Sequence, residues 1–520
     1  MAFLSRHEAG TPSPRAPGML DALFPIVAVI VMLALSVTLF GADSSSGPTQ
    51  IALIMGAMLA AVVGLKNGHQ WQAIEEGINR GIHLSLGAIL ILLSVGAMIG
   101  TWTMGGVVPT MIYYGLEILS PHYFYATACL LCALVSVSVG SSWTVAGTIG
   151  IGLIGIANGL GLSSAITAGA IISGGYFGDK MSPLSDTTNL APASAEAELF
   201  AHIRHMLWTT TPSLILALIA FLVLGLGGPD QVATPERITD IQQTLSDHFT
   251  ISAWLLLPLL ALLVMAWKQM PAFPTIFIGA LLGVVFALIF QREAVITLAD
   301  TPSLGHAMAL LKGSWIALYD GYSAHTGNDA IDALLTNGGM DSMLTTVWLI
   351  LSAMTFGGVI ERLGLLERAV SGLLRVARST SSLIISTLAT GLATNIVTGD
   401  QYLSVVLPGR IYKAEFQRRR LKPVNLSRAL EDSGTITSPL IPWNSCGAYM
   451  AATLGVATLS YAPFAFFNLI NLGIAVLYAL IGFRVTRMSD DEQPDHGVDL
   501  PTLSDGQIID DQYEANTGRA

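Results

Sequence analysis

Long apolar stretches, nearly free of charged residues, recur along the chain from Ala22 to Phe483. Each is long enough to cross a hydrocarbon core of about 30 Å as an α-helix. Stretches such as Ile26–Leu39 and Leu255–Ala266 are continuously apolar, whereas the strands of a membrane β-barrel alternate apolar and polar residues. The pattern therefore predicts an all-α polytopic membrane protein.

Composition and charge agree with this prediction. Of the 520 residues, 52% are hydrophobic and only 11% are charged. The net charge of −11 lies mostly in residues 488–520, which hold nine Asp or Glu residues and one Arg. Such a segment is typical of a disordered, solvated tail, and no basic or repetitive stretch indicates a nucleic-acid partner.

Basic residues predict the orientation, because Lys and Arg concentrate on the cytoplasmic side of membrane proteins. We expect ten crossings, re-entrant hairpins at 123–161 and 381–417, and interrupted crossings at 163–190 and 426–457. With both termini cytoplasmic, this arrangement places all but four of the 24 Lys and Arg residues inside. Of those four, Arg237, Arg292 and Lys312 fall outside and Lys180 falls within the membrane.

Three pairs of similar segments, in the same order, indicate an internal repeat. Leu93–Gly106 resembles Leu351–Gly364, Gly178–Leu184 resembles Gly434–Leu440, and Met55–Leu65 resembles Ile278–Leu288. Each repeat would hold five transmembrane helices and one re-entrant hairpin, so the second copy is inverted relative to the first. The expected domains are a cytoplasmic N-terminal segment 1–21, a first repeat 22–226, an external linker 227–251, a second repeat 252–485 with an external insertion 291–342, and an acidic cytoplasmic tail 486–520.

Inverted repeats place substrate sites near the membrane midplane at broken helices, because irregular backbone at that depth must line a cavity or be buried in protein. The sequence marks four such places: the two hairpin tips, at 140–144 and 395–401, and two breaks, at 178–189 and 433–445. Their candidate ligands are Ser141, Ser142, Thr398 and Asp400 at the tips, and Asp179, Lys180, Ser182, Asp186, Thr187, Thr188, Asn189, Glu431, Asp432, Ser438 and Asn444 at or beside the breaks.

Charged groups are costly inside a membrane, so intramembrane carboxylates are functional candidates. Oxygen ligands suit a hard cation, and we place Na⁺ at Asp186, Thr187 and Asp400. Other interpretations stay open: Glu431 and Asp432 could form the charged start of a helix near the cytoplasmic surface. The Ser141 and Ser142 side chains could instead serve as small packing residues.

Several motifs are absent from the sequence. It has no Walker-type phosphate loop, no TVGYG-like filter and no histidine within the four marked places. We therefore expect neither an enzyme nor an ATP-driven pump, with no catalytic residues and no cofactor. Proton binding at the marked places would then depend on carboxylates, and a carboxylate that holds either a proton or Na⁺ is a simple route to cation/proton exchange.

The stretch Gly175–Pro192, GYFGDKMSPLSDTTNLAP, resembles the signature of NhaC-type Na⁺/H⁺ antiporters of the ion transporter superfamily. Gly321–Met340, Thr398–Tyr402, Glu431–Thr435 and Pro442–Gly447 support the resemblance, which spans roughly residues 20–485. It implies a secondary antiporter of a prokaryotic inner membrane, with membrane lipid, Na⁺ and H⁺ as its partners. Related transporters suggest a homodimer.

These features are compatible with three candidate functions. The leading hypothesis is export of Na⁺, or also Li⁺, in exchange for entering protons. The alternative is a Na⁺- and H⁺-coupled exchanger of small carboxylates such as malate or lactate, for which Lys180 would be the anion partner. A passive cation channel is the weakest of the three, because inverted repeats and broken helices are typical of transporters.

Overall fold

The computed structural model describes residues 14–489, except 228–234, 302, 304, 328–330, 333, 334 and 337. Within this part of the chain the secondary structure is helical, apart from isolated β-bridges such as that between Leu421 and Arg487. Among the described residues, eight helices are long and apolar enough to cross a membrane, or up to ten if each of two bent helix pairs counts as one span. The prediction of an all-α polytopic membrane protein is confirmed, and its ten crossings stay a prediction.

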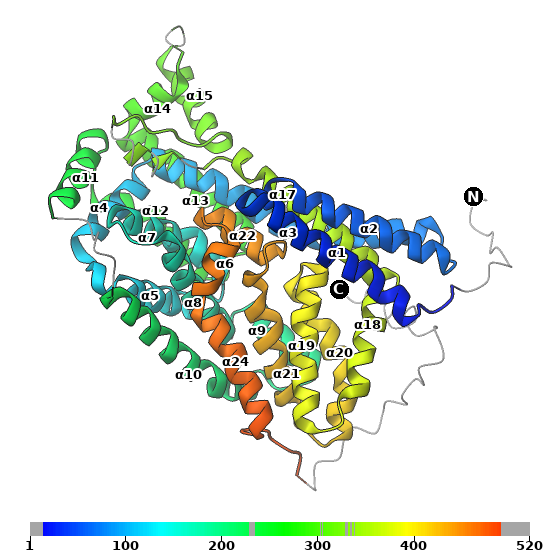
Figure 1. The fold of residues 1–520 in the computed structure, drawn as a ribbon. Helices are drawn as coiled ribbons and strands as arrows, with labels where there is room; N and C mark the ends of the chain where they lie inside the picture. Colours follow the sequence, from blue (N-terminus) through cyan, green and yellow to red (C-terminus); the bar gives the residue numbers. More distant parts are fainter. Residues whose placement is uncertain are drawn as a thin grey trace.

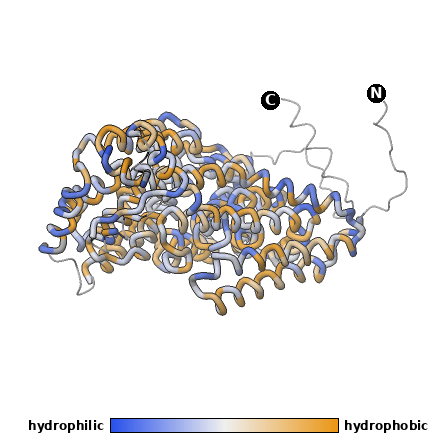
Figure 2. The backbone as a smooth tube through the Cα atoms, turned by 90° about the horizontal axis from the view of Figure 1, so that it is seen from above, coloured by the Kyte–Doolittle hydropathy of each residue, from blue (hydrophilic) through white to orange (hydrophobic). Residues whose placement is uncertain are grey.

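Long helices form one side of the molecule (Figure 1). They are α1 (Met19–Phe40), α2 (Pro48–Lys66), α3 (Trp71–Met104), α12 (Leu257–Trp267), α13 (Ala272–Phe290) and α17 (Leu344–Arg362). The 34-residue helix α3 packs against both α13 and α17, and α2 packs against α1 and α17. We call this group the α3 bundle. Apolar residues run along much of the length of its helices (Figure 2).

A second group of helices, which we call the hairpin bundle, contains the predicted hairpins and helix breaks together with one long helix of 28 residues. It contains α5 (Phe124–Val139), α6 (Ser142–Val145), α7 (Ile151–Gly159), α8 (Ser164–Met181), α9 (Asp186–Ala195), α10 (Leu199–Leu226), α19 (Thr380–Thr398), α20 (Gln401–Arg418), α21 (Pro423–Leu430), α22 (Ser445–Leu454), α23 (Thr458–Tyr461) and α24 (Phe466–Ile481). Here α5 packs against α8, α10 against α24, and α20 against α9 and α19.

The remaining helices join or extend these bundles. Helices α4 (Val107–Ile118) and α18 (Leu365–Val376) each follow a long helix of the α3 bundle. The expected linker 227–251 contains α11 (Pro235–His248), which contacts α4. The expected insertion 291–342 contains α14 (Arg292–Ala299) and α15 (His306–Tyr319), which extend one end of the molecule (Figure 1). The first 13 residues and residues 490–520 of the acidic tail lie outside the described residues.

Both predicted hairpin tips turn at a glycine with positive φ. Gly140 (φ 77°) ends α5 and Gly399 (φ 67°) ends α19, a conformation that residues with a Cβ atom rarely adopt. Space is limited as well, because a Cβ atom on Gly140 would lie 2.8 Å from the backbone of Leu184, and one on Gly399 would lie 3.1 Å from the carbonyl oxygen of Trp443. Each tip therefore sits directly against one of the predicted helix breaks.

Candidate functional site

The tips and breaks create new helix starts that point into the interior. The side chain of Asp400 caps α20 by accepting a hydrogen bond of 2.8 Å from the Leu403 N–H. Ser185 caps α9, so that Asp186 is the first helical residue, and Asn444 caps α22. Negative charge is favourable at a helix N-terminus, which gives Asp186 and Asp400 a local source of stabilisation inside the protein.

A cavity of about 220 Å³ lies where these helix starts meet the α3 bundle. Three predicted carboxylates, Asp179, Asp186 and Asp400, line it together. Its other lining residues are Leu84, Ser85, Gly87, Ala88 and Ile91 of α3, Met354 of α17, Ala272 of α13, and Gly140, Ser141, Trp143, Thr187, Gln401, Tyr402, Ser445 and Cys446. The structure thus brings carboxylates from three separate segments to one space.

Asp179 is buried and strongly held by hydrogen bonds. One carboxylate oxygen accepts from the Ser142 hydroxyl at 2.6 Å and from the Ser142 N–H at 3.3 Å, and the other accepts from the Ser185 hydroxyl at 2.5 Å. Asp179 therefore joins the first hairpin tip to both sides of the first break. Hydrogen bonds to a charged group are stronger than neutral ones, so this carboxylate has a positioning role as well as a place at the cavity.

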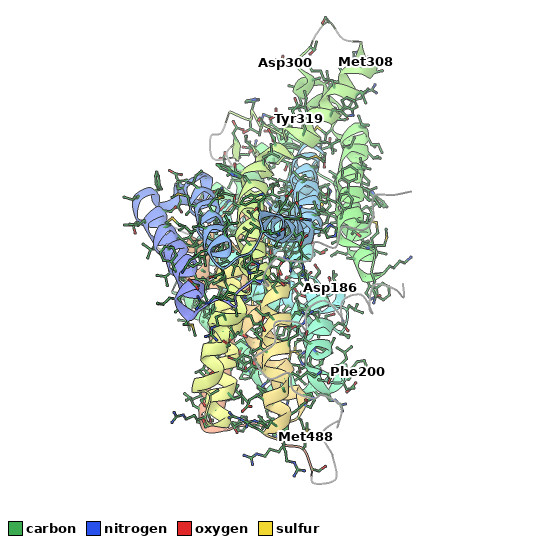
Figure 3. The ribbon with its side chains drawn as sticks, turned by 90° about the vertical axis from the view of Figure 1, so that its right-hand side faces the viewer. Asp186, Phe200, Asp300, Met308, Tyr319 and Met488 are labelled. Atoms are coloured by element: carbon green, nitrogen blue, oxygen red, sulfur yellow. The ribbon has the colours of Figure 1, made fainter. Side chains whose placement is uncertain are left out.

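Asp186 lies in a more open environment, near the middle of the molecule (Figure 3). It also lines a second cavity of about 410 Å³, which reaches the loop before α13 at Gln269 and Met270. Gly140, Ser141 and Ala272 line both cavities as well. Asp186 therefore stands where a route from the α12–α13 loop enters the inner cavity.

Gln401 and Tyr402 follow Asp400 directly and also face the cavity. The side-chain oxygen of Gln401 accepts hydrogen bonds of 3.0 Å from the Ser438 hydroxyl and of 3.0 Å from the Cys446 thiol. The charges of Asp179, Asp186 and Asp400 all act on the Tyr402 hydroxyl. Sequence reasoning did not select Gln401, Tyr402 or Cys446, although Gln401 is the last residue of the marked tip and Tyr402 follows it directly.

Other predicted residues support the site from behind. The Thr188 hydroxyl donates to the carbonyl oxygens of Asp179 and Lys180 at 2.8 and 3.0 Å. Hydrogen bonds to local backbone or neighbouring side chains also occupy Ser182, Asn189, Thr398 and Asn444. Of these residues, Asn189 also lines the second cavity. Among the described residues, no three His, Cys, Asp or Glu side chains converge closely enough to hold a metal ion.

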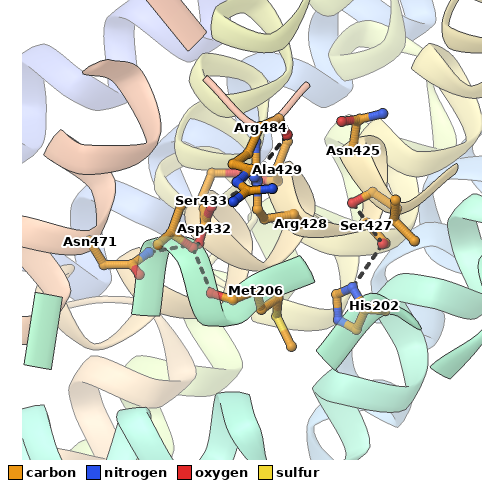
Figure 4. Close-up of polar contacts among 12 residues, drawn as sticks. His202, Met206, Asn425, Ser427, Arg428, Ala429, Asp432, Ser433, Asn471 and Arg484 are labelled. Atoms are coloured by element: carbon orange, nitrogen blue, oxygen red, sulfur yellow. Dashed lines mark hydrogen bonds and ion pairs between the residues drawn. The ribbon is translucent and has the colours of Figure 1, made fainter. Parts of the chain in front are cut away.

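Lys180 and Asp432 form a separate, buried polar cluster. Their ion pair is joined by Asn471 of α24, whose side-chain nitrogen donates to Asp432 at 2.8 Å, and by the Thr209 hydroxyl of α10 at 3.1 Å (Figure 4). Arg428 lies 4.0 Å from the other oxygen of Asp432. None of these five residues lines the inner cavity. Lys180, which the sequence predicted within the membrane, is thus paired away from the carboxylate-lined space.

The neighbouring residue Glu431 has no exposed surface and begins a π-helical segment, Glu431–Thr435. His202 of α10 is also fully buried and shares a hydrogen bond of 2.8 Å with the hydroxyl of Ser427, four residues before Glu431 (Figure 4). Sequence reasoning placed no histidine at the breaks, because His202 lies outside them along the chain. Two histidines and an arginine near the start of a largely apolar helix, at His202, Arg204 and His205, were the available signal.

Comparisons with known proteins identify relatives over most of the chain. Residues 174–483 match the model of the Na⁺/H⁺ antiporter family. The Na⁺/H⁺ antiporter NhaC of Alkalihalophilus pseudofirmus is 38% identical over 84% of this chain and 90% of its own length. The malate-2H⁺/Na⁺-lactate antiporter of Bacillus subtilis is 37% identical over 89% and 95%. The arginine/ornithine antiporter ArcD of Halobacterium salinarum is 34% identical over 93% and 96%.

Proposed function

The chain belongs to the Na⁺/H⁺ antiporter family, and from that premise we propose that it exports Na⁺, and also Li⁺, in exchange for protons that enter the cell. It is a transporter with membrane-spanning helices, and the NhaC-type resemblance predicted from its sequence is confirmed. The proton gradient would drive the exchange without ATP.

One observation carries the proposal: the charged lining of the inner cavity is entirely acidic. Asp179, Asp186 and Asp400 line it, and none of the described residues around it is Lys, Arg or His. Such a lining attracts cations and repels free carboxylate anions. We infer that Na⁺ and protons compete for these carboxylates.

The ligands would come from both chain halves. Asp186, Thr187 and Asp400 are the proposed direct contacts of Na⁺, and Ser141, whose hydroxyl accepts hydrogen bonds from the N–H and the hydroxyl of Thr144, lines the cavity beside them. Asp179, already holding three hydrogen bonds, would take up or release a proton or fix the geometry. Ser142, Ser182, Thr188, Asn189, Thr398, Ser438 and Asn444 would keep these groups in place.

Exchange of small carboxylates is the second candidate, because the Bacillus subtilis malate-2H⁺/Na⁺-lactate antiporter is 37% identical to this chain. In this chain, the residue expected to bind such an anion, Lys180, is paired with Asp432 and does not line the cavity. A carboxylate solute would therefore have to enter together with a cation. This arrangement favours Na⁺/H⁺ exchange as the first function to test.

Alternating access would rest on an inverted repeat, which we propose from matching helix starts and ends. Ser141 and Asp400 cap the helices that follow the two hairpin tips, and they are 259 residues apart. Ser185 and Asn444 cap the helices that follow the two breaks, α9 and α22, and they are also 259 residues apart. Both α9 and α22 have ten residues. The spacing of these caps differs by three residues from the sequence match of Gly178 with Gly434. The matching Ser-Pro-Leu segments differ in structure. In the first half, residues 182–184 follow the end of α8, whereas in the second half Ser438–Leu440 form a 3₁₀ turn, and this accounts for the difference in spacing.

Two hydrogen bonds recur at the same spacing and support the repeat. The Ser142 hydroxyl donates to Asp179, and at the equivalent positions Gln401 accepts from Ser438. Likewise, Ser136 donates to the carbonyl oxygen of Gly175 at 2.6 Å, and Asn395 donates to that of Gly434 at 2.5 Å. The tip and the break of each half would thus form one movable unit. We further propose a homodimer in a prokaryotic inner membrane, with both termini cytoplasmic.

Everted membrane vesicles provide the test, with a pH-sensitive dye reporting proton movement. Adding Na⁺ or Li⁺ should release protons from acidified vesicles, whereas K⁺ and lactate should not. Glu415→Gln, a change at an ion pair remote from the cavity, is the control. A response to lactate or malate alone would support the carboxylate exchanger, and Na⁺ flux without proton movement would support a channel.

A further inference from the structure

Glu431 is a buried carboxyl group that the cavity does not use. Its side chain has no exposed surface, and among the described residues neither of its oxygens makes a well-formed hydrogen bond, the Thr435 hydroxyl being the group that acts on it as a donor. Burying an unpaired ionised carboxylate is costly, whereas the protonated form is far less so. An unsatisfied buried polar group in a native fold calls for a functional explanation.

Glu431 adjoins the buried ion pair along the chain and is linked through it to the cavity. It directly precedes Asp432, and the partner of Asp432, Lys180, directly follows Asp179 on α8. Asp179 lines the cavity, and Lys180 pairs with Asp432. A change in the charge of Glu431 therefore alters the electrostatic environment of the cavity carboxylate Asp179 and of the Lys180–Asp432 pair.

A row of polar side chains runs past Glu431 along the chain. Ser427, Glu431 and Thr435 follow one another at intervals of four residues along α21 and its π-helical continuation, and Ser438 begins the 3₁₀ turn that follows. The Thr435 hydroxyl also makes no well-formed hydrogen bond among the described residues. We call these four residues the Glu431 row.

Both ends of the Glu431 row connect to further polar groups. At one end, the Ser438 hydroxyl bonds to Gln401, which lines the inner cavity. At the other end, Ser427 bonds to His202, whose second ring nitrogen has no partner among the described residues. Glu431 is the carboxyl group of this row, and in chain order it lies between Ser427, which bonds to His202, and Ser438, which bonds to Gln401.

We propose that Glu431 is a second proton-binding site, separate from the Na⁺-binding cavity, and that the Glu431 row passes protons between His202 and the cavity side. A proton binds to a carboxylate oxygen of Glu431 and leaves from that oxygen, and no covalent bond changes. The inference rests on the proposed Na⁺/H⁺ exchange. It adds that the proton route and the Na⁺ route diverge behind the break between α8 and α9.

The test separates two exchange modes of purified protein in proteoliposomes. ²²Na⁺/Na⁺ exchange at equal pH needs no proton step, whereas Na⁺-driven proton movement does. Glu431→Gln keeps the volume and imitates the protonated side chain. We expect it to retain ²²Na⁺/Na⁺ exchange, to show reduced Na⁺-driven proton movement, and to carry fewer protons per Na⁺ when an imposed pH gradient is balanced against a Na⁺ gradient, because the cavity carboxylates still exchange Na⁺ for protons.

Two further variants complete the experiment. Glu431→Asp keeps a carboxyl group and should preserve the proton count while it shifts the pH dependence, and this readout remains if Glu431→Gln does not fold. Glu415→Gln should change neither mode. Wild-type proton count and pH dependence in both Glu431 variants would overturn the inference, and so would an equal fall in the two modes, which indicates a structural role. Absence of Na⁺/H⁺ exchange in the unmodified protein would instead overturn the proposed function.

Discussion

Lys180 of α8 and Asp432 of the π-helical segment form an ion pair in which both side chains are buried, with relative exposures of 0% and 1%. The two residues come from different halves of the chain, and their pairing occupies the lysine that an anionic substrate would require. The carboxylates Asp179, Asp186 and Asp400 are left to face the cavity without a basic neighbour in its lining. The proposed preference for a cation over an anion therefore depends on this ion pair.

Breaking the pair should be far more harmful than removing it. Asp432→Leu leaves Lys180 as a buried charge without its partner and should cost about 3–5 kcal/mol of stability. Lys180→Met should cost less, because Arg428 lies 4.0 Å from Asp432 and still compensates its charge. The double variant should recover most of this loss. Thermal unfolding of the purified variants in detergent, analysed as a double-mutant cycle, measures the coupling. Additive losses in the two single variants would show that the pair does not act as a unit.

Neutralising the cavity carboxylates should abolish transport without preventing folding. Asp186→Asn and Asp400→Asn each remove a charge and a titrating group with little change in volume, and Asn also caps a helix well at position 400. Na⁺-dependent proton flux in vesicles should collapse in both variants, with the amount of inserted protein measured in parallel. Ser185→Ala, which removes a neutral hydroxyl bonded to Asp179, should lower transport only in part. Normal flux in both Asp variants would end the carboxylate mechanism.

The hydrogen bond between Ser142 and Asp179 should contribute to stability. Its oxygen–oxygen distance is 2.6 Å and both side chains are buried, so Ser142→Ala should cost about 1.5–3 kcal/mol, the range for a hydrogen bond to a charged group. The equivalent change in the second half, Ser438→Ala, removes a bond to the neutral amide of Gln401 and should cost about 0.5–1.5 kcal/mol. Unfolding temperatures of the two variants provide the comparison, and a reversed order would contradict it.

Residues 490–520 should be removable with transport retained, whereas the four residues before them should not. Thr486 and Met488 pair through their backbones with Lys422 and Arg420, and Asn425 also bonds to Thr486. Truncation after Ser489 keeps these contacts, and truncation after Val485 removes them. Protein yield, unfolding temperature and transport should fall only in the shorter form. A well-inserted but inactive longer form would reveal a role for the acidic tail.

The predicted topology places the linker helix α11 outside and α18 inside. Leu245 and Val370 are both buried, so substituted cysteines are better placed at the exposed neighbours Asp247 and Glu367. A membrane-impermeant thiol reagent added to intact cells should label position 247 and not position 367. Everted vesicles should give the opposite result. Labelling of both positions from the same side would require a different number of crossings.

Much of the fold follows from the sequence, because its signals are local. Continuous apolar stretches predicted the membrane helices. Glycines at 140 and 399 marked the turns that the structure contains, since their positive φ angles are conformations that glycine adopts readily. Pro183, with polar residues on both sides, marked the break between α8 and α9. These features depend on neighbouring residues, so they could be recognised without knowledge of packing.

Only the tertiary structure separated the candidate residues into two groups. Adjacent in sequence, Asp179 and Lys180 point to different places, one toward the cavity and the other toward Asp432. Glu431 and Asp432 diverge in the same way, because successive residues on a helix face different neighbours. Those neighbours, such as His202 and Asn471, come from distant segments whose packing no local pattern encodes. The sequence determined which polar groups enter the membrane, and the packing of the hairpin bundle decided which of them meet.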